Sequence, residues 1–342
     1  MNKIKNIILS SLTISIFGLA SAGSIYFAKG NDIVPLEAIE GNYYSEISDS
    51  LTGDDLLNAL HALNNKKRTK LVTYAGFRQA CATFDADPDG SGRIISFYTN
   101  DLIGPNWDGG SSWNREHVWP NARGGKYVED DAHMVRPAST SINSERGSKG
   151  YSLSAYDPGQ YVSYYRGAAA RIIFYSAIAD TNLKIIDNPL NYDGSNPPNS
   201  MGSLSEMLKW NLEYQPNDTS FTGADDLARR TELNRNEQIQ NSAVGQGNRN
   251  PFIDHPEYAC RIWGNTNEKT KEICKSNINS NTNTDVDVDN NEETTNNNTS
   301  INNGIKLNCG GNIISTSVIL STISLLGIGL ILIKKIGKKE DE

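Results

Sequence analysis

The segment SSWNREHVWPNARGG, residues 111–125, places a carboxylate directly before a histidine, at Glu116 and His117. The chain has only 4 histidines. A second polar segment, residues 129–151 (EDDAHMVRPASTSINSERGSKGY), carries Asn143. A carboxylate and an amide oxygen are hard ligands, which Mg²⁺ accepts while it keeps several waters, and a neutral imidazole can take a proton near neutral pH. These residue types are the ones that a metal-assisted attack of water on a phosphate requires.

A strand, a turn and a short helix would have to position these residues. Asp131 and His133 are two apart, so on a strand they would share a face. Serines and threonines suited to capping follow, and they predict a short helix that ends at Gly147. Asn143 and Arg146, three apart on that helix, would point the same way.

The backbone around Glu116 and His117 is predicted to be irregular. Adjacent residues of a regular strand face opposite sides, so a straight strand over residues 113–119 would contradict one of the two assignments. Glycine pairs on both sides of the motif, together with Pro120, favour a bent connection.

Three motifs, WNREHVWP, DDAHMVRPASTSINSERG and GNRNPFIDHPEYACRIW, follow one another in this order along the chain. Over most of residues 50–264 the chain resembles the endonuclease I family of secreted or periplasmic bacterial nucleases, and YRGAAARIIFYSA and LKWN are further similar pieces. That family carries the ββα-metal, or His-Me finger, site. The resemblance implies a metal-dependent endonuclease that leaves 5′-phosphate and 3′-hydroxyl ends.

The resemblance also implies roles for the residues that open the two motifs. His117 matches the general base that activates water. Glu116 and Asn143 match the direct ligands of one divalent ion, Mg²⁺ or else Mn²⁺ or Ca²⁺. The ion would stabilise charge on the pentacovalent phosphorus and on the leaving 3′ oxygen.

Further residues follow from the resemblance in the same way. The arginine that stabilises the phosphate is expected at Arg123, with Lys126 as the substitute, because the spacing in this chain is shorter there than in the family. Glu129 occupies a position whose residue, in the family, supports the site without binding the metal directly. Arg136 and Arg146 either contact phosphate or brace the fold.

Local patterns outside the motifs predict a mostly helical domain. Acids after Thr52 and an apolar stripe in TGDDLLNALHAL indicate a helix. Further helices are predicted at 167–180, which is apolar enough to lie at the centre of the core, at 204–214 and at 225–240, and a strand at 93–99. Residues 85–92 resemble the start of a calcium-binding loop, but a turn into the strand fits better because Ser96 replaces the bidentate acid. The fold class is α+β, with a single catalytic domain around a ββα-metal motif.

The two ends of the chain have the composition of targeting and anchoring segments. The predicted organisation is a signal peptide at 1–22, a catalytic domain at 31–264, a disordered Asn/Thr-rich linker at 265–312, a transmembrane helix at 313–333 and a cytoplasmic tail at 334–342. Lysines directly after the apolar stretch place the tail in the cytoplasm. We therefore expect an exported, cell-surface protein whose catalytic domain lies outside the membrane.

Charge and cysteine content limit how the protein can bind a polyanion and whether it can form a disulfide. Asp and Glu number 40 against 32 Lys and Arg, and acids remain in excess in residues 31–264. A polyanion must then be held by a local basic cluster and a metal, because the field of the whole protein does not attract it. The 4 cysteines permit a disulfide in an exported chain. Cys260 and Cys274 are the nearest pair, but the sequence leaves the pairing open.

Other conspicuous residues are interpreted as structural. His61 lies within a helical stripe, and His133 and His255 are expected to tie segments together. Trp113 and Trp119 are expected to pack against the motif and not to stack on bases.

The predicted function is hydrolysis of extracellular DNA, with RNA as a further substrate, by a monomeric catalytic domain of low sequence specificity. The chain has no recognisable module that reads bases, which favours cutting through backbone contacts. Two alternatives are a surface protein that captures DNA without cutting it and a phosphodiesterase for small phosphate esters.

Overall fold

The computed structural model describes residues 43–187 and 197–278. The signal peptide, the membrane helix and the tail that the sequence predicts lie outside these ranges, as does most of the predicted linker. No helix within the described ranges is long and apolar enough to cross a membrane.

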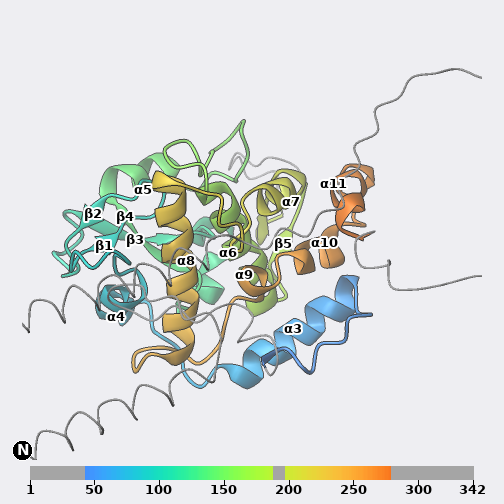
Figure 1. The fold of residues 1–342 in the computed structure, drawn as a ribbon, viewed down its shortest axis with the longest axis horizontal. Coiled ribbons are helices and arrows are strands. Elements are labelled where there is room, and N and C mark those ends of the chain that lie inside the picture. Colours follow the sequence, from blue (N-terminus) through green and yellow to red (C-terminus); the bar gives the residue numbers. More distant parts are fainter. Residues whose placement is uncertain (1–42, 188–196, 279–342) are drawn as a thin grey trace, which may run out of the picture. The chain divides into compact units, whose positions relative to one another are not determined.

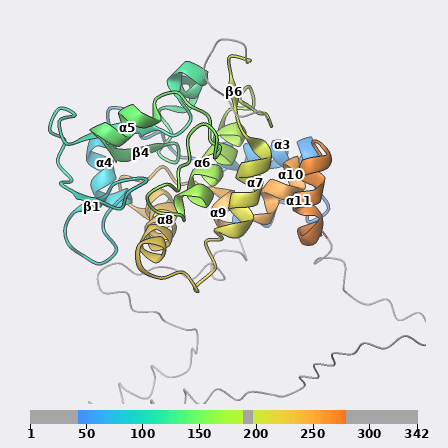
Figure 2. The same ribbon diagram turned by 90° about the horizontal axis from the view of Figure 1, so that it is seen from above.

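Helix α6, Tyr165–Ala179, lies at the centre of the core, and nearly all of its residues are buried. A helix that is apolar around its whole surface must be covered on every side. The helices that cover it are α3 (Gly53–Lys67), α7 (Leu204–Glu213), α8 (Gly223–Asn241) and α9 (Pro251–Asp254). Figures 1 and 2 show α6 among them. The four helices predicted from the sequence are confirmed, with ends that differ by a few residues.

Helix α3 illustrates how local sequence forms these elements. Its first turn carries two aspartates and its last turn two lysines, which complement the helix dipole. Leu56, Leu60 and Leu63 form its buried stripe. His61 donates from Nδ1 to the carbonyl oxygen of Ile178 on α6 at 2.6 Å, so this histidine has the predicted structural role.

Strands in the described ranges form three two-stranded sheets. Strand β1 (Ile94–Ile95) pairs antiparallel with β2 (Leu102–Ile103), and β5 (Lys184–Ile185) pairs parallel with β6 (Ser200–Met201). The third sheet carries the candidate site. A mostly helical α+β domain with small sheets confirms the predicted class.

The strand predicted at 93–99 is wrong for most of its length. Tyr98 and Asn100 have φ angles of 77° and 62°, in the left-handed region that non-glycine residues rarely adopt. The chain turns there, and the Tyr98 side chain is fully buried. Aromatic and β-branched residues are also buried in turns, so a high content of them in residues 93–99 was not enough to predict a strand there.

The turn predicted at 85–92 is confirmed. Both carboxylate oxygens of Asp87 accept hydrogen bonds from backbone amides of that turn, those of Asp89 and Ser91, at 3.0 and 3.2 Å. Helix α4 (Phe77–Phe84) precedes this turn and packs against α8.

Asp131 and His133 lie in a turn and not on the strand that their spacing suggested. His133 is 3% exposed, and its Nε2 donates to the carbonyl oxygen of Asn248 at 3.2 Å. Trp113 and Trp119 are fully buried, as predicted for packing residues.

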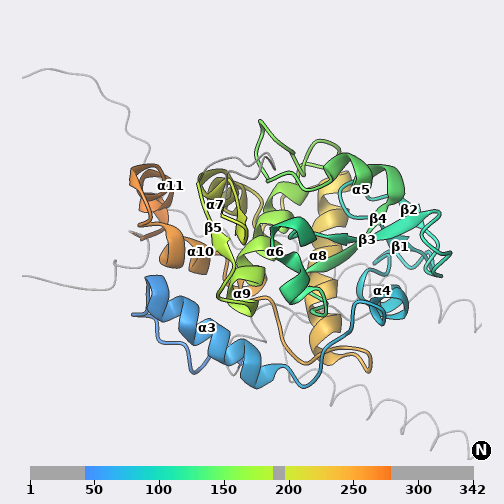
Figure 3. The same cartoon turned by 180° about the vertical axis from the view of Figure 1, so that it is seen from behind.

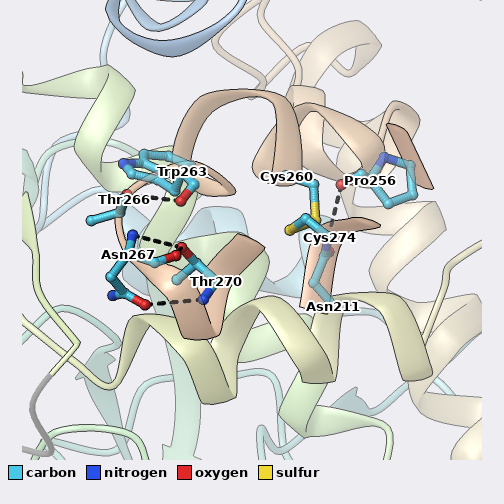
Figure 4. The surroundings of a disulfide bond; sticks show 8 residues. All are labelled: Asn211, Pro256, Cys260, Trp263, Thr266, Asn267, Thr270 and Cys274. Carbon is cyan, nitrogen blue, oxygen red and sulfur yellow. Dashed lines mark hydrogen bonds between the residues drawn. A yellow bond between two sulfur atoms is a disulfide. The ribbon is translucent and has the colours of Figure 1, made fainter. Parts of the chain in front are cut away.

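A disulfide joins Cys260 and Cys274, the pair that is nearest in sequence (Figure 4). It links α10 (Glu257–Trp263) to α11 (Glu268–Ile278). Cys81 is buried and has a free thiol.

The start of the predicted linker at residue 265 is wrong, because α11 forms within it. Asn267 and Thr270 cap this helix reciprocally: each backbone amide donates to the side chain of the other residue at 3.0 Å (Figure 4). The Asn-rich composition of residues 265–312 as a whole did not indicate this short helix, which a disulfide and a cap stabilise.

Candidate active site

The candidate site is built on a hairpin and the helix that follows it. Strand β3 (Trp113–His117) pairs antiparallel with β4 (Val135–Ser139). Helix α5 (Thr140–Arg146) starts at the next residue and packs against both strands, as Figures 1 and 3 show. Gly147, with φ of 54°, ends the helix where the sequence predicted.

The irregular backbone predicted between Glu116 and His117 is not observed. Both belong to β3, and the bend begins only at Val118. Strand alternation therefore sends the two side chains to opposite faces. The Glu116 carboxylate contacts α5, whereas the His117 ring contacts Tyr74 and Glu129. The strand stops at His117, so a straight strand over all of residues 113–119 is not present either.

The Glu116 carboxylate is 2% exposed and is held through one oxygen. Its Oε1 accepts a hydrogen bond from the Tyr98 hydroxyl at 2.7 Å and lies 3.3 Å from Nε of Arg146. Its Oε2 accepts no hydrogen bond from any residue in the described ranges. Burial raises the pKa of Glu116 above its ordinary value, while the Arg146 charge and the Tyr98 hydrogen bond lower it.

The two groups that hold Glu116 are themselves fixed. Arg146 donates to the carbonyl oxygens of Gly147 and Val118 at 2.7 and 2.6 Å. The Tyr98 hydroxyl also hydrogen-bonds the Tyr151 hydroxyl at 2.5 Å. Burial raises the pKa of Tyr98 well above its ordinary value, so its hydroxyl keeps its proton and donates. The position of Oε1 is thus determined by buried groups from three different segments.

Asn143 lies on α5 one turn before Arg146, so it shares the helix face that contacts Glu116. Its carboxamide makes no hydrogen bond to a described residue and is partly exposed. The described ranges contain no group of three His, Cys, Asp or Glu side chains that could hold a metal. One carboxylate oxygen and one amide oxygen without partners are a donor set that fits a hard divalent ion, which would take its other ligands from water.

His117 is oriented by Glu129. The two side chains meet at 3.2 Å between Nε2 and Oε2. Because a carboxylate only accepts, Nε2 carries the proton in this contact and Nδ1 is the basic nitrogen. Nδ1 makes no hydrogen bond to a described residue. Burial lowers the pKa of His117, against the opposing effect of Glu129, so the ring stays neutral at neutral pH.

The residues predicted to contact phosphate are mostly buried. Arg123 is 2% exposed and donates from Nε to the carbonyl oxygen of Ser148 at 2.6 Å. Arg136 pairs with the buried Asp85 at 2.8 Å, and Arg146 is fully buried. Lys126 is exposed. In this conformation the three arginines brace the fold, and their contact with phosphate stays a prediction.

Sequence reasoning missed four residues of the site. Tyr98 donates to the Glu116 carboxylate and Tyr151 hydrogen-bonds Tyr98. Tyr74 and Arg115 lie beside His117. Arg115 stands within the motif itself, so its position two residues before His117 was the one available signal. The tyrosines come from segments that local pattern does not connect to the hairpin.

Known proteins are similar to this chain in the region that contains β3, β4 and α5. A model of the family described as Endonuclease I matches residues 52–160. An extracellular ribonuclease of Bacillus subtilis strain 168 is 33% identical over 242 residues, which are 64% of this chain and 78% of that protein. An extracellular ribonuclease of Bacillus amyloliquefaciens is 32% identical over 266 residues, 71% of this chain and 86% of that protein. No solved structure matches the chain.

The residues that the family model matches include β3, β4 and α5, and with them Glu116, His117, Glu129 and Asn143. The relatives are covered over most of their length, so the likeness extends from the hairpin to the helices around it. On this combined ground the chain belongs to the endonuclease I family.

Proposed function

We propose that this nuclease cuts phosphodiester bonds within RNA and DNA outside the cell, with one divalent ion and with little sequence preference. The observation that carries the proposal is the Glu116 carboxylate. Its Oε1 is held by Tyr98 and Arg146, while Oε2 and the neighbouring Asn143 carboxamide have no partner in the described ranges.

Glu116 and Asn143 would hold the ion, with Mg²⁺ as the first candidate and Mn²⁺ or Ca²⁺ as alternatives. When bound there, such an ion supplies stabilisation of negative charge on the phosphate and on the leaving 3′ oxygen. The chain contributes a carboxylate whose orientation is set before the ion arrives, because Tyr98 and Arg146 hold Oε1 and leave Oε2 without a partner in the described ranges. This arrangement reduces the ordering required on binding.

His117 would act as the general base through Nδ1. Its side chain leaves the face of β3 opposite to Glu116, but it is the last residue of the strand. Arg146, which pairs with Glu116, also lowers the pKa of His117 by its charge, so both groups lie within the electrostatic range of one arginine. Glu129 fixes the tautomer by accepting from Nε2, and it stabilises the imidazolium that forms when Nδ1 takes a proton from water. The water oxygen then attacks the phosphorus as the bond to the 3′ oxygen breaks, and the 3′ oxygen takes a proton from solvent, which gives 5′-phosphate and 3′-hydroxyl ends. The imidazolium then returns its proton to solvent. General bases placed in this way contribute about 10²- to 10⁴-fold in rate.

Substrate and location are proposed from the relatives and from the predicted end segments. Both relatives are named extracellular ribonucleases, which favours RNA as the first substrate to test beside the DNA that the motifs suggested. The predicted signal peptide at 1–22 and membrane helix at 313–333 support export and a surface anchor.

The experiment is digestion of a circular plasmid, linear DNA and single-stranded RNA by the purified protein with Mg²⁺, Mn²⁺ or Ca²⁺, and with EDTA. Glu116→Gln, His117→Ala and Asn143→Ala should lose activity. Glu145→Gln, an exposed carboxylate on α5, is the matched control and should retain it. Cutting of the closed circle identifies endonucleolytic attack. Binding without cutting under every metal condition would refute the proposal in favour of a capture protein.

Metal binding is tested separately by isothermal titration of Mn²⁺. The wild type and His117→Ala should bind the ion, whereas Glu116→Gln and Asn143→Ala should bind it more weakly. Equal binding by Glu116→Gln would place the ion elsewhere.

A further inference from the structure

Two arginines and two aromatic rings form a row that starts beside His117. The Tyr74 and His117 ring centres are 4.6 Å apart. Arg115, on the same face of β3 as His117, has its Cζ 3.5 Å from the Tyr74 ring centre and 5.2 Å from that of Trp107. Arg78, in the first turn of α4, has its Cζ 5.0 Å from the same Trp107 ring. We call Tyr74, Arg115, Trp107 and Arg78 the Arg–aromatic row.

The two arginines of the row are not paired with carboxylates in the described ranges, although the charge of Glu129 acts on Arg115 from beyond ion-pair distance. By contrast, the buried Arg136, Arg171 and Arg249 each pair with a carboxylate. Neither Arg78 nor Arg115 forms an ion pair with a carboxylate of the described ranges, and Nε of each is buried without a hydrogen-bond partner there. A buried donor without a partner is costly. The terminal N–H groups of Arg78 also donate to no described residue, so this partly exposed guanidinium can take an acceptor from a ligand.

Geometry indicates the kind of acceptor. An arginine that stacks on an aromatic ring keeps the N–H groups on the edge of its plane free, and these groups match the oxygens of a phosphate. All four side chains of the row are partly exposed, so a ligand can reach them. The combination of cationic and aromatic side chains along one path is typical of sites for single-stranded nucleic acid.

We propose that Arg78 and Arg115 bind a backbone phosphate next to the scissile one, on the strand whose cleaved bond lies at His117. Tyr74 and Trp107 hold the two guanidinium planes. The proposal rests on the proposed function, because it extends that site along the substrate. The bound group is a phosphodiester, which RNA and DNA share.

Arg78 separates this role from a structural one. Arg115 also donates to the carbonyl oxygen of Tyr74 at 2.5 Å, so its removal disturbs the loop before α4. The guanidinium of Arg78 donates no hydrogen bond to a described residue. Arg78→Gln should therefore change binding without changing the melting temperature.

The binding experiment uses labelled single-stranded RNA and DNA oligonucleotides in EDTA, with the dissociation constant measured by fluorescence anisotropy across a salt series. Arg78→Gln should weaken binding and reduce the slope of log affinity against log salt by about 0.7, the value for one phosphate contact on a single strand. Arg78→Lys keeps the charge and should keep the slope. Arg93→Gln, an exposed arginine outside the row without an ion pair in the described ranges, is the matched control and should leave both quantities unchanged.

Three results would refute phosphate binding by the row. The first is an unchanged salt slope in Arg78→Gln, and the second is an equal loss of affinity in Arg78→Lys. The third is a loss of affinity confined to RNA or to DNA. Binding in EDTA needs no catalysis, so failure of the wild type to cut nucleic acid would refute the proposed function and leave this test valid. If the wild type cuts, Arg78→Gln should raise KM on oligonucleotides and leave kcat within about twofold, because a contact away from the reacting atoms contributes uniform binding.

Discussion

Acid sensitivity of the fold should depend on His133. Its imidazole is 3% exposed and donates from Nε2 to the Asn248 carbonyl oxygen, so the neutral ring has Nδ1 as its basic atom. Burial lowers the pKa of His133 to about 4, and the charges of Arg235 and Arg249 act in the same direction, whereas Asp131 opposes them.

The direction of the effect follows from which state binds the proton. In the unfolded chain His133 titrates near 6.5, so below that pH the unfolded state holds a proton that the folded state does not. The free energy of unfolding should therefore be insensitive to His133 above its unfolded pKa. It should fall as the pH drops from 6.5 to about 4, and the shift corresponds to a loss of about 3 kcal/mol.

Urea unfolding followed by tryptophan fluorescence, from neutral pH down to about pH 4, measures this loss. His133→Gln keeps an amide that can donate to Asn248 but removes the titration. Every other group is common to the two proteins, so the difference between their unfolding free energies isolates the histidine. The wild type should lose about 3 kcal/mol more than the variant over the range. Parallel curves for the two proteins would refute the assignment of a buried neutral imidazole.

Three further predictions concern stability and rate. Arg171→Met leaves Glu232 buried without its bidentate partner and should lower the unfolding free energy by about 3 to 5 kcal/mol. In a double-mutant cycle, adding Glu232→Gln should recover part of the lost unfolding free energy. If the effects of the two substitutions simply add, the pairing of Arg171 with Glu232 is contradicted. Reduction of the Cys260–Cys274 disulfide, which closes a short loop, should cost about 3 kcal/mol in thermal or urea unfolding. Cleavage activity should persist, and its loss would show that α10 and α11 influence the site. Glu129→Gln should lower kcat on oligoribonucleotides by less than the roughly 10²- to 10⁴-fold expected for loss of the general base itself. A fall in melting temperature instead of in kcat would make Glu129 structural.

Local sequence predicted several of the helices and singled out Glu116 and His117 as the candidate central pair. Helix α6 could be predicted because its apolar residues cover its whole surface, and α5 because serines and threonines precede it and Gly147 ends it. The strand at 93–99 and the linker start at 265 were wrong for one physical reason. Composition reports how readily a segment is buried, but not which partner, cap or disulfide decides its conformation.

Only the tertiary structure decided which groups surround the central pair. The Glu116 carboxylate is held by Tyr98 from a turn and by Arg146 from α5, and both contacts require segments that meet only after folding. Sequence could not foresee that Arg123 is buried, because a charge is paired or exposed according to what packs around it.

The adjacency of Glu116 and His117 comes from the sequence, as does the proposal of a carboxylate and an imidazole for the chemistry. Strand geometry then separated them onto opposite faces of β3, since adjacent residues of a strand alternate. Packing supplied each with a different neighbourhood, Arg146 and Tyr98 for the acid and Glu129 and Tyr74 for the base. The residue types are thus determined by the sequence, whereas their orientation and their charge partners are determined by long-range packing, which local patterns do not encode.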